Sequence, residues 1–431
     1  MQPKFLWLSI MLAASSANVY AAGFGLIDNS VANMGNAYAG AAASAEDAST
    51  VWFNPAGMAE LDDGTHVSAG VHIVKPTAEF TNNGSIKSDS TPLTGNGISE
   101  KTAYIPNAYA VKPINDKVKV GLGVNAPYGL ETNYDANWAG RYNAIKSAMK
   151  SVNVNPSLSY KVNDKVALGA GLNAQYIDAE LTSAVDLSAV GGADGKATIK
   201  GDDWSYGYNV GALLKPSAKT KVGVSYRSKM DHTLKGSATY DYTLPVGLPP
   251  PVVTLLNARL ADKNAQAAAN LPASLSVSVA HKVNDKVEVL GDITRTNWSS
   301  FQELKVVNSA DGSPIALTTE DWKDVNRYSL GMNYKYNDRL KLRTGVALDK
   351  EPIPNANRRT PRIPGNDRKW VSVGANYKLN KGMSVDVGYS HLFVKNTDIN
   401  NTDEGVAPAH TVKGTYKADV DIVGAQLNWR F

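Results

Sequence analysis

The sequence predicts an all-β fold, a 14-stranded antiparallel transmembrane β-barrel with a small N-terminal helical hatch inside the lumen. Three observations predict it: short polar turns recur along the chain, the segments between them alternate polar and apolar residues, and the last strand ends on Phe431. These features are typical of outer-membrane barrels, because one face of each strand meets lipid while the other meets the lumen.

The turns are short and alike in composition. Asn, Asp and Gly tolerate the left-handed backbone that tight hairpins need. Each interval between two turns can hold two crossing strands of about 9 to 11 residues and one long loop. Five intervals supply ten strands and the two flanks supply four more, which gives the 14 strands and seven long outer loops. The turns lie at residues 114–117, 162–165, 216–219, 283–286, 336–339 and 380–382.

The strands between these turns alternate with a period of two, as one-sided burial requires. One face of the segment 152–160 carries Val152, Val154, Pro156, Leu158 and Tyr160, and the other carries only Asn and Ser. The C-terminal segment places Val423, Ala425, Leu427, Trp429 and Phe431 on a single face. We expect Phe431 to be the signal that the barrel-assembly machinery reads, and we expect a monomer. A soluble β-sandwich is the rival interpretation.

The first 21 residues have the layout of a secretory signal peptide. Lys4 precedes an apolar stretch from Phe5 to Ala14, and a small-residue site comes before Ala22. The apolar stretch is too short for a membrane-spanning helix, which needs about 20 residues. We therefore expect residues 1–21 to be removed, no transmembrane helix in the mature protein, and an outer-membrane location among bacterial outer-membrane lipids.

Composition excludes several kinds of site. The chain has no cysteine, which removes disulfides, thiolate metal sites and cysteine nucleophiles, and its formal charge of +4 gives no support for nucleic-acid binding. The glycine-rich strings at 121–126 and 169–174 lie inside strands, so we expect small residues that make room in the lumen rather than a phosphate cradle. None of the six histidines falls in a metal or serine-elbow motif. We expect no metal, no cofactor and no enzymatic activity, with an outer-membrane hydrolase as the alternative.

Residues 22–63 differ from the strands that follow. They are rich in alanine, which favours short helices, and the step from Asn54 to Pro55 and Ala56 ends a helix. We expect this segment to be the hatch, and residues 64–431 to be the barrel. A pore built from 14 strands would leak if it were empty, so a plug is physically expected.

Several strings resemble the FadL family of long-chain fatty acid transporters. In the hatch these are Gly23-Phe24, residues 35–40, Asp47-Ala48 and Asn54-Pro55-Ala56; later strings are residues 271–274, 298–301, 322–324, 343–349 and 367–370. The resemblance covers essentially the whole mature chain. It implies passive uptake of long-chain fatty acids, with aromatic or aliphatic hydrocarbons as the alternative cargo.

The resemblance also implies where a ligand would bind. It places Phe24, Lys323 and Asp349 beside the ligand, with Lys323 holding a carboxylate. The second basic head-group residue of the family is not matched in residues 179–183. The fourth outer loop, residues 229–270, is apolar at Leu244, Val246 and Leu248, and with the third loop, residues 178–203, it would form a capture groove.

The third strand contains a break in its alternation. Its residues are Asn125, Ala126, Pro127, Tyr128 and Gly129. Proline cannot donate to a strand ladder, so Pro and Gly together predict a bulge or kink. FadL-like barrels carry a kink here that leaves a hole in the wall, which implies a lateral gate that opens when the hatch moves. A strand that simply ends here is the alternative.

Overall fold

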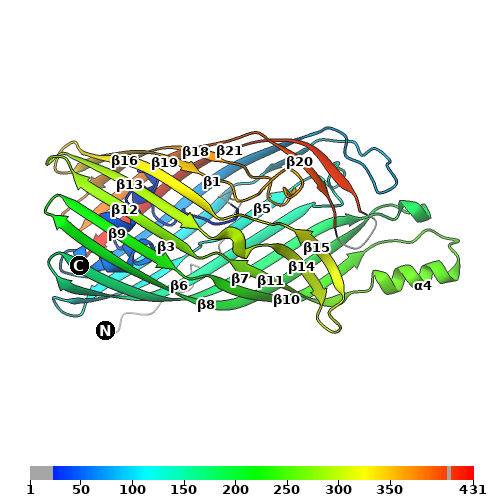
Figure 1. Ribbon diagram of the computed structural model, residues 1–431, viewed down its shortest axis with the longest axis horizontal. Helices are drawn as coiled ribbons and strands as arrows, with labels where there is room; N and C mark the ends of the chain where they lie inside the picture. Colours follow the sequence, from blue (N-terminus) through cyan, green and yellow to red (C-terminus); the bar gives the residue numbers. More distant parts are fainter. Residues whose placement is uncertain (1–22, 405–408) are drawn as a thin grey trace.

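The computed structural model describes residues 23–404 and 409–431, so the expected signal peptide lies outside the described residues. The described chain forms one long barrel of tilted strands with short connections at one end and long loops at the other (Figure 1). Within these residues no helix is long and apolar enough to cross a membrane.

The described strands close into the predicted 14-stranded antiparallel barrel. Seven of the 14 strands are continuous, and each of the other seven consists of two pieces. The continuous strands are β1 His66–Asn82, β6 Lys146–Asn163, β7 Val166–Val185, β8 Gly195–Ser217, β17 Leu340–Asp349, β18 Arg368–Lys378 and β21 Thr411–Arg430. The two-piece strands are β2 Gly97–Glu100 with β3 Ala103–Pro113, β4 Val118–Asn125 with β5 Gly129–Asn133, β9 Thr220–Arg227 with β10 Met230–Asp241, β11 Lys263–Leu271 with β12 Ser274–Lys282, β13 Val287–Thr296 with β14 Glu303–Asn308, β15 Pro314–Thr319 with β16 Val325–Lys335, and β19 Met383–Val394 with β20 Thr397–Thr402.

The first and last strands complete the ring. β1 pairs with β21 from His66 opposite Arg430 to Asn82 opposite Gly414. This pairing leaves neither terminal strand with an unpaired edge along its partner, and an open edge would be costly in a membrane.

The six short turns are confirmed, and one kind of hydrogen bond between a side chain and the backbone recurs in them. The Asn115 side-chain oxygen accepts from the backbone N–H groups of Lys117 and Val118. Asn284 and Asn337 make the same two bonds, and Asn163 accepts from the N–H of Lys165. Asn380 accepts from the N–H of Gly382 in the last turn. These Asx turns explain why the tetrapeptide recurs.

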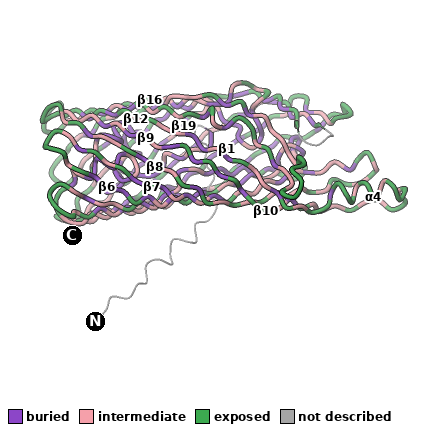
Figure 2. The backbone as a smooth tube through the Cα atoms, turned by 60° about the horizontal axis from the view of Figure 1, so that its bottom comes forward, coloured by how far each residue is buried: buried purple, intermediate pink, exposed green. Residues whose placement is uncertain are grey.

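The predicted alternation is also confirmed. Leu158 and Tyr160 are exposed on the outer wall, whereas Ser157 and Ser159 are buried on the inner wall. Buried and less buried residues alternate along the strands in Figure 2. The outer wall is apolar and the inner wall is polar.

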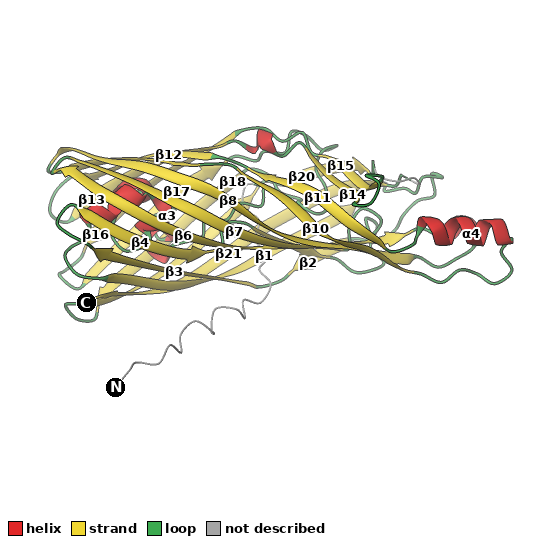
Figure 3. Ribbon diagram, turned by 90° about the horizontal axis from the view of Figure 1, so that it is seen from below, coloured by secondary structure: helices red, strands yellow, loops and turns green. Residues whose placement is uncertain are grey.

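Short helices of the hatch lie inside the barrel, toward the end with the short turns (Figure 3). The hatch helices are α1 Val31–Met34, α2 Ala41–Ser44, α3 Thr50–Phe53 and the 3-10 helix η1 Pro55–Glu60. Glycines of the wall let the hatch approach closely: a Cβ added at Gly169 would overlap the backbone of Ala56, and one at Gly121 would overlap Met58. Both glycines therefore make room in the lumen, as the sequence predicts.

The expected bounds of two outer loops are wrong. The third loop spans only residues 186–194, because β7 and β8 stay paired up to Val185 opposite Gly195. The fourth loop spans residues 242–262, because β10 continues to Asp241 and pairs with β11 up to Ala238 opposite Lys263. It contains helix α4, Pro250–Arg259, which projects from the barrel (Figure 1). The two remaining 3-10 turns are η2 Ser188–Val190 and η3 Trp298–Ser300.

Candidate functional site

A cavity of about 180 Å³ lies in the lumen between the hatch and the wall. The hatch contributes Leu26, Tyr38 and Phe53, and the wall contributes Trp298 and Trp370, among others. Apolar and aromatic side chains with a few polar groups among them are what sites for hydrophobic ligands present.

An aromatic cluster packs beside this cavity. The ring of Phe24 lies 4.8 Å from the ring of Trp298 and 5.3 Å from that of Phe301, and the rings of Trp298 and Trp322 are 5.0 Å apart. Glu320 accepts a hydrogen bond from the Trp322 indole nitrogen at 2.8 Å.

Arg327 places a cation at the cavity. Its side chain is 7% exposed, it donates to the carbonyl of Ala37 at 2.7 Å, and its guanidinium lies 5.2 Å from the ring centre of Trp370. Its Nε is buried and has no partner among the described residues. A buried donor without a partner is costly, so Arg327, whose side chain lines the cavity, carries an unused donor that is itself enclosed by protein.

Arg227 supplies a second cation from β9, which is three strands away from β16 along the wall. It donates to the Asn173 side-chain oxygen and to the Trp52 carbonyl, both at 2.7 Å, and its guanidinium stacks 3.3 Å over the Trp52 ring. Two acids also line the cavity, Asp292 and Asp349. Asp292 already accepts hydrogen bonds from Ser278 and Thr294.

Neither arginine was expected from the sequence, although a signal was present. Arg227 follows Val222, Val224 and Tyr226 in an alternating run, so its side chain belongs on the luminal face. Arg327 precedes Tyr328 in another alternating run, so its side chain also belongs on the luminal face. Alternation gives the face, but it does not say which luminal residues meet the hatch.

The expected ligand residues are spread over different places. Phe24 is buried in the aromatic cluster, and Asp349 lines the cavity with a carboxylate oxygen 3.7 Å from Arg368. Lys323 has an exposed side chain and is absent from the cavity lining. The apolar loop residues also lie away from the cavity, in the fourth loop, and Val246 is fully exposed; they are Leu244, Val246 and Leu248.

The third barrel strand is interrupted where the sequence departs from alternation. β4 ends at Asn125 and β5 begins at Gly129, and both pieces pair with β6. On the other side, the described ladder with β3 stops at Ala108 opposite Val124. Beyond this pair, no ladder between β3 and β5 is described in the wall.

The hatch takes the place of the missing neighbour. The N–H of Leu26 donates to the carbonyl of Pro127 at 2.7 Å, and the N–H of Gly129 donates to the carbonyl of Phe24 at 3.0 Å. Residues 127–129 thus pair with the start of the hatch.

The hatch motif is anchored at another part of the wall, on β8. Asn54 is fully buried, donates to the carbonyls of Ala42 at 2.7 Å and Ala212 at 3.0 Å, and accepts from the N–H of Ala56 at 3.1 Å. Ala212 belongs to β8, so one side chain joins two hatch helices to the wall. Pro55 occupies the first position of η1, where its missing N–H costs nothing.

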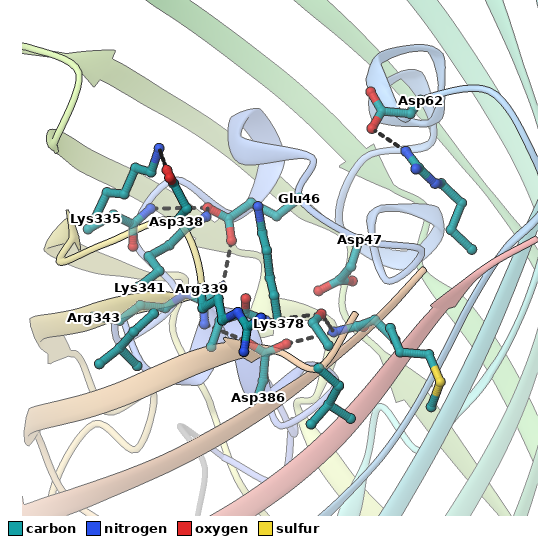
Figure 4. Close-up of a pocket in the computed structure, with 18 of the residues that line it drawn as sticks. Glu46, Asp47, Asp62, Lys335, Asp338, Arg339, Lys341, Arg343, Lys378 and Asp386 are labelled. Carbon is teal, nitrogen blue, oxygen red and sulfur yellow. Dashed lines mark hydrogen bonds and ion pairs between the residues drawn. The ribbon is translucent and has the colours of Figure 1, made fainter. Parts of the chain in front are cut away.

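Below the hatch, the end with the short turns opens into a charged vestibule of about 910 Å³. Figure 4 shows Glu46 of the hatch reaching toward Lys341 and Arg343, at 2.9 and 2.6 Å, and Arg343 also pairs with Asp386. These ion pairs fasten the hatch to the wall. Within the described ranges no group of three or more acidic or histidine side chains could hold a metal ion.

Comparison with known proteins gives consistent matches. Residues 11–431 match the family model described as "Outer membrane protein transport protein (OMPP1/FadL/TodX)". A "Long-chain fatty acid transport protein" of Salmonella typhi is 32% identical over 91% of this chain and 92% of its own length. A "47 kDa outer membrane protein" of Pasteurella multocida is 32% identical over 98% of this chain and 97% of its own.

Solved structures agree on the fold. The crystal structure of a Pseudomonas aeruginosa FadL homologue has a TM-score of 0.88 at 27% identity, covering 95% of this chain and 100% of that one. The Pseudomonas putida toluene transporter TodX reaches a TM-score of 0.69 at 18% identity, covering 89% of this chain and 94% of that one, which shows a shared fold.

Proposed function

The chain belongs to the OMPP1/FadL/TodX family of outer-membrane transport proteins, and from this premise we propose that it carries long-chain fatty acids passively across the outer membrane. The family membership makes it an outer-membrane transporter of hydrophobic compounds. The fatty acid itself, the route and the residues involved belong to the proposal.

The observation that carries the choice of a fatty acid is the pair of guanidinium groups among the aromatic and polar side chains that line the cavity. Arg327 has an unused buried donor, and Arg227 can turn its donors toward a ligand. Hydrogen bonds to a charged partner contribute about 1.5 to 3 kcal/mol, so a carboxylate head gains what a neutral head does not.

The size of the cavity requires movement. At about 180 Å³ it is smaller than a typical ligand pocket of roughly 300 to 1,000 Å³, so it holds only part of a long acyl chain. Displacement of Phe24 would enlarge it, because the Phe24 ring packs against Trp298 and Trp322 next to the cavity. Hatch movement near Phe24 is therefore part of the proposed cycle.

The proposed exit is lateral, through the gap at residues 126–129. Each methylene exposed to water costs about 0.8 kcal/mol, and the route below the hatch crosses a vestibule lined by Glu46, Lys341, Arg343 and Asp386. Sideways exit into lipid avoids that route. The interrupted strand supports it, because residues 127–129 bond to the hatch, so movement of the hatch would uncover the gap.

Capture from outside is assigned to the exposed loops. Leu244, Val246 and Leu248 offer apolar surface on the fourth loop, and Lys323 offers a cation near the aromatic cluster. We further propose a monomer without catalytic activity that is assembled through Phe431.

The second candidate cargo is an aromatic or aliphatic hydrocarbon. The aromatic cluster favours it, and Asp292 and Asp349 partly offset the two cations at the cavity. A hydrolase would need a nucleophile with a base, and an esterase assay of the purified protein tests that reading.

The test is to identify what the purified protein holds and how Arg327 affects it. Mass spectrometry of co-purified lipid should find long-chain fatty acids. Arg327→Gln should weaken fatty-acid binding by about 1.5 to 3 kcal/mol and leave alkylbenzene binding unchanged. Equal losses for both ligands, or only hydrocarbons in the extract, would overturn the fatty-acid assignment.

A further inference from the structure

A ladder of asparagine side chains runs along the inner wall beside the hatch. Five of its six members are buried with at most 3% exposure on the wall strands β4, β6, β7 and β8, and the sixth belongs to the hatch. The members are Asn29, Asn125, Asn153, Asn155, Asn173 and Asn209. Fully buried amides in such number need a reason, because each must find partners.

The ladder connects the interrupted strand to the cavity. Asn125, the last residue of β4, donates to the side-chain oxygen of Asn29 at 3.1 Å and accepts from Asn153 at 3.2 Å. Asn153 also donates to the side-chain oxygen of Asn173 at 3.2 Å, and Arg227 donates to the same oxygen at 2.7 Å.

Both ends of this path lie on the hatch. Asn29 is in the hatch, and Arg227 donates from its other nitrogen to the carbonyl of Trp52 in α3. Arg227 also lines the cavity, whereas Asn173 does not. One chain of hydrogen bonds therefore joins the proposed head-group site, the proposed gate and two parts of the hatch.

The ladder is only partly satisfied. The side-chain oxygens of Asn153 and Asn155 and the side-chain nitrogen of Asn209 are buried without a partner among the described residues. A network with unused donors and acceptors gains by exchanging partners when one member moves. This is the property that a switch between two arrangements requires.

We propose that Asn173 is a positioning residue that couples the binding of an anionic head group at Arg227 to the opening of the gate. The inference rests on the proposed function. A carboxylate at the cavity competes with the Asn173 oxygen and the Trp52 carbonyl for the donors of Arg227. When Arg227 turns to the ligand, Asn173 loses its charged donor, Asn153 changes partner, and the bond between Asn125 and Asn29 loosens beside the gap.

This coupling makes opening depend on charge. A neutral hydrocarbon filling the same cavity leaves Arg227 on Asn173, so the gate keeps its ligand-free arrangement. A ligand can shift the equilibrium only through such a differential contact.

The test reports gate opening directly. Ala126→Cys introduces a single thiol into this cysteine-free chain, at the gap. In the otherwise unchanged protein, oleate should raise the rate of maleimide labelling at position 126 at least threefold, and an alkylbenzene should not. Adding Asn173→Ala should make the rate insensitive to oleate, while oleate binds at least as tightly as in the parent, because Arg227 no longer has to leave the Asn173 oxygen.

Gln175→Ala is the matched control. Gln175 is an amide on the same face of β7, two residues away, and it bonds to His232 instead of the ladder. Gln175→Ala should keep the response to oleate. If Asn173→Ala fails to fold, Asn153→Ala is a second variant that interrupts the ladder. A preserved response in folded Asn173→Ala, or oleate binding without any labelling response in the parent, would overturn the coupling alone. No oleate binding by the parent would overturn the proposed function as well.

Discussion

Asn54 shows how a single side chain can fix a whole segment. It bonds to Ala42 of α2, to the start of η1 and to β8, so it sets the hatch against one side of the wall. Its removal would leave the buried carbonyls of Ala42 and Ala212 with one partner fewer. Such a loss costs about 1 to 3 kcal/mol.

Asn54→Ala should therefore impair ligand uptake while leaving the barrel assembled. The strands pair through their backbones and do not depend on this side chain. Uptake of labelled fatty acid, measured with a gel assay of folding, separates the two effects. Normal uptake by the folded variant would show that uptake does not depend on Asn54.

Lys323 tests whether the exposed cation contributes as well. Its side chain is exposed, so Lys323→Ala should weaken fatty-acid binding by no more than about 1 kcal/mol, the usual contribution of an exposed ion pair. Arg327→Gln should cost more because Arg327 is buried. Titration of both variants with one fatty acid shows which variant loses more affinity. A larger loss of affinity in Lys323→Ala would indicate that the head-group site lies at the mouth of the barrel.

The sequence predicts the face of a residue better than its partners. Alternation puts Asn153, Asn155 and Asn173 on the luminal face and predicts the polar wall correctly. It does not reveal that Asn153 meets Asn125 or that Arg227 meets Trp52. The first contact follows from the register in which β4 pairs with β6, and the second depends on where the hatch sits; no local pattern encodes either.

At the level of elements, the interrupted third strand is stabilised by the hatch rather than by β3. Unpaired backbone groups at membrane depth are costly, and the bonds from Leu26 and to Phe24 satisfy two of them. Pro127 marked this place in the sequence. The partner could not be predicted, because it lies about 100 residues earlier in the chain and joins only in the folded lumen.

A disulfide between the hatch and this strand should block transport. Gly25 and Tyr128 form an antiparallel bridge, and Cα atoms in such pairs lie about 4.5 to 5.5 Å apart, within the range of disulfides. The double variant Gly25→Cys, Tyr128→Cys should bind fatty acid from outside but stop uptake, and a reductant should restore it.

The matched control is a disulfide elsewhere in the wall. Val346 and Val371 are paired and exposed on the outer face of β17 and β18. Joining them through cysteines should leave uptake unchanged. Undiminished uptake through a verified link at Gly25 and Tyr128 would place the exit elsewhere, for example past the hatch.

On the scale of the whole molecule, closure and the fastened hatch make one stable unit. β1 meets β21 along its full length, and Glu46 ties the hatch to β17 through Lys341 and Arg343. The strand count followed from turn spacing alone. The loop bounds did not, because the pairing of β7 with β8 continues past the membrane into residues that a membrane-thickness argument assigns to loops.

Processing and location follow from this architecture. The precursor should lose residues 1–21 and fractionate with the outer membrane, and the barrel should migrate differently on gels before and after boiling, because a closed ladder resists detergent. N-terminal sequencing and fractionation check both points. Intact precursor in the cytosol would contradict them.

Uptake by cells that lack any other outer-membrane route for fatty acids measures the proposed transport itself. Cells producing this protein should take up labelled oleate many times faster than cells with an empty vector, and Arg327→Gln should reduce the rate at limiting oleate. Uptake equal to that of the empty vector, with folded protein present in the outer membrane, would contradict the account.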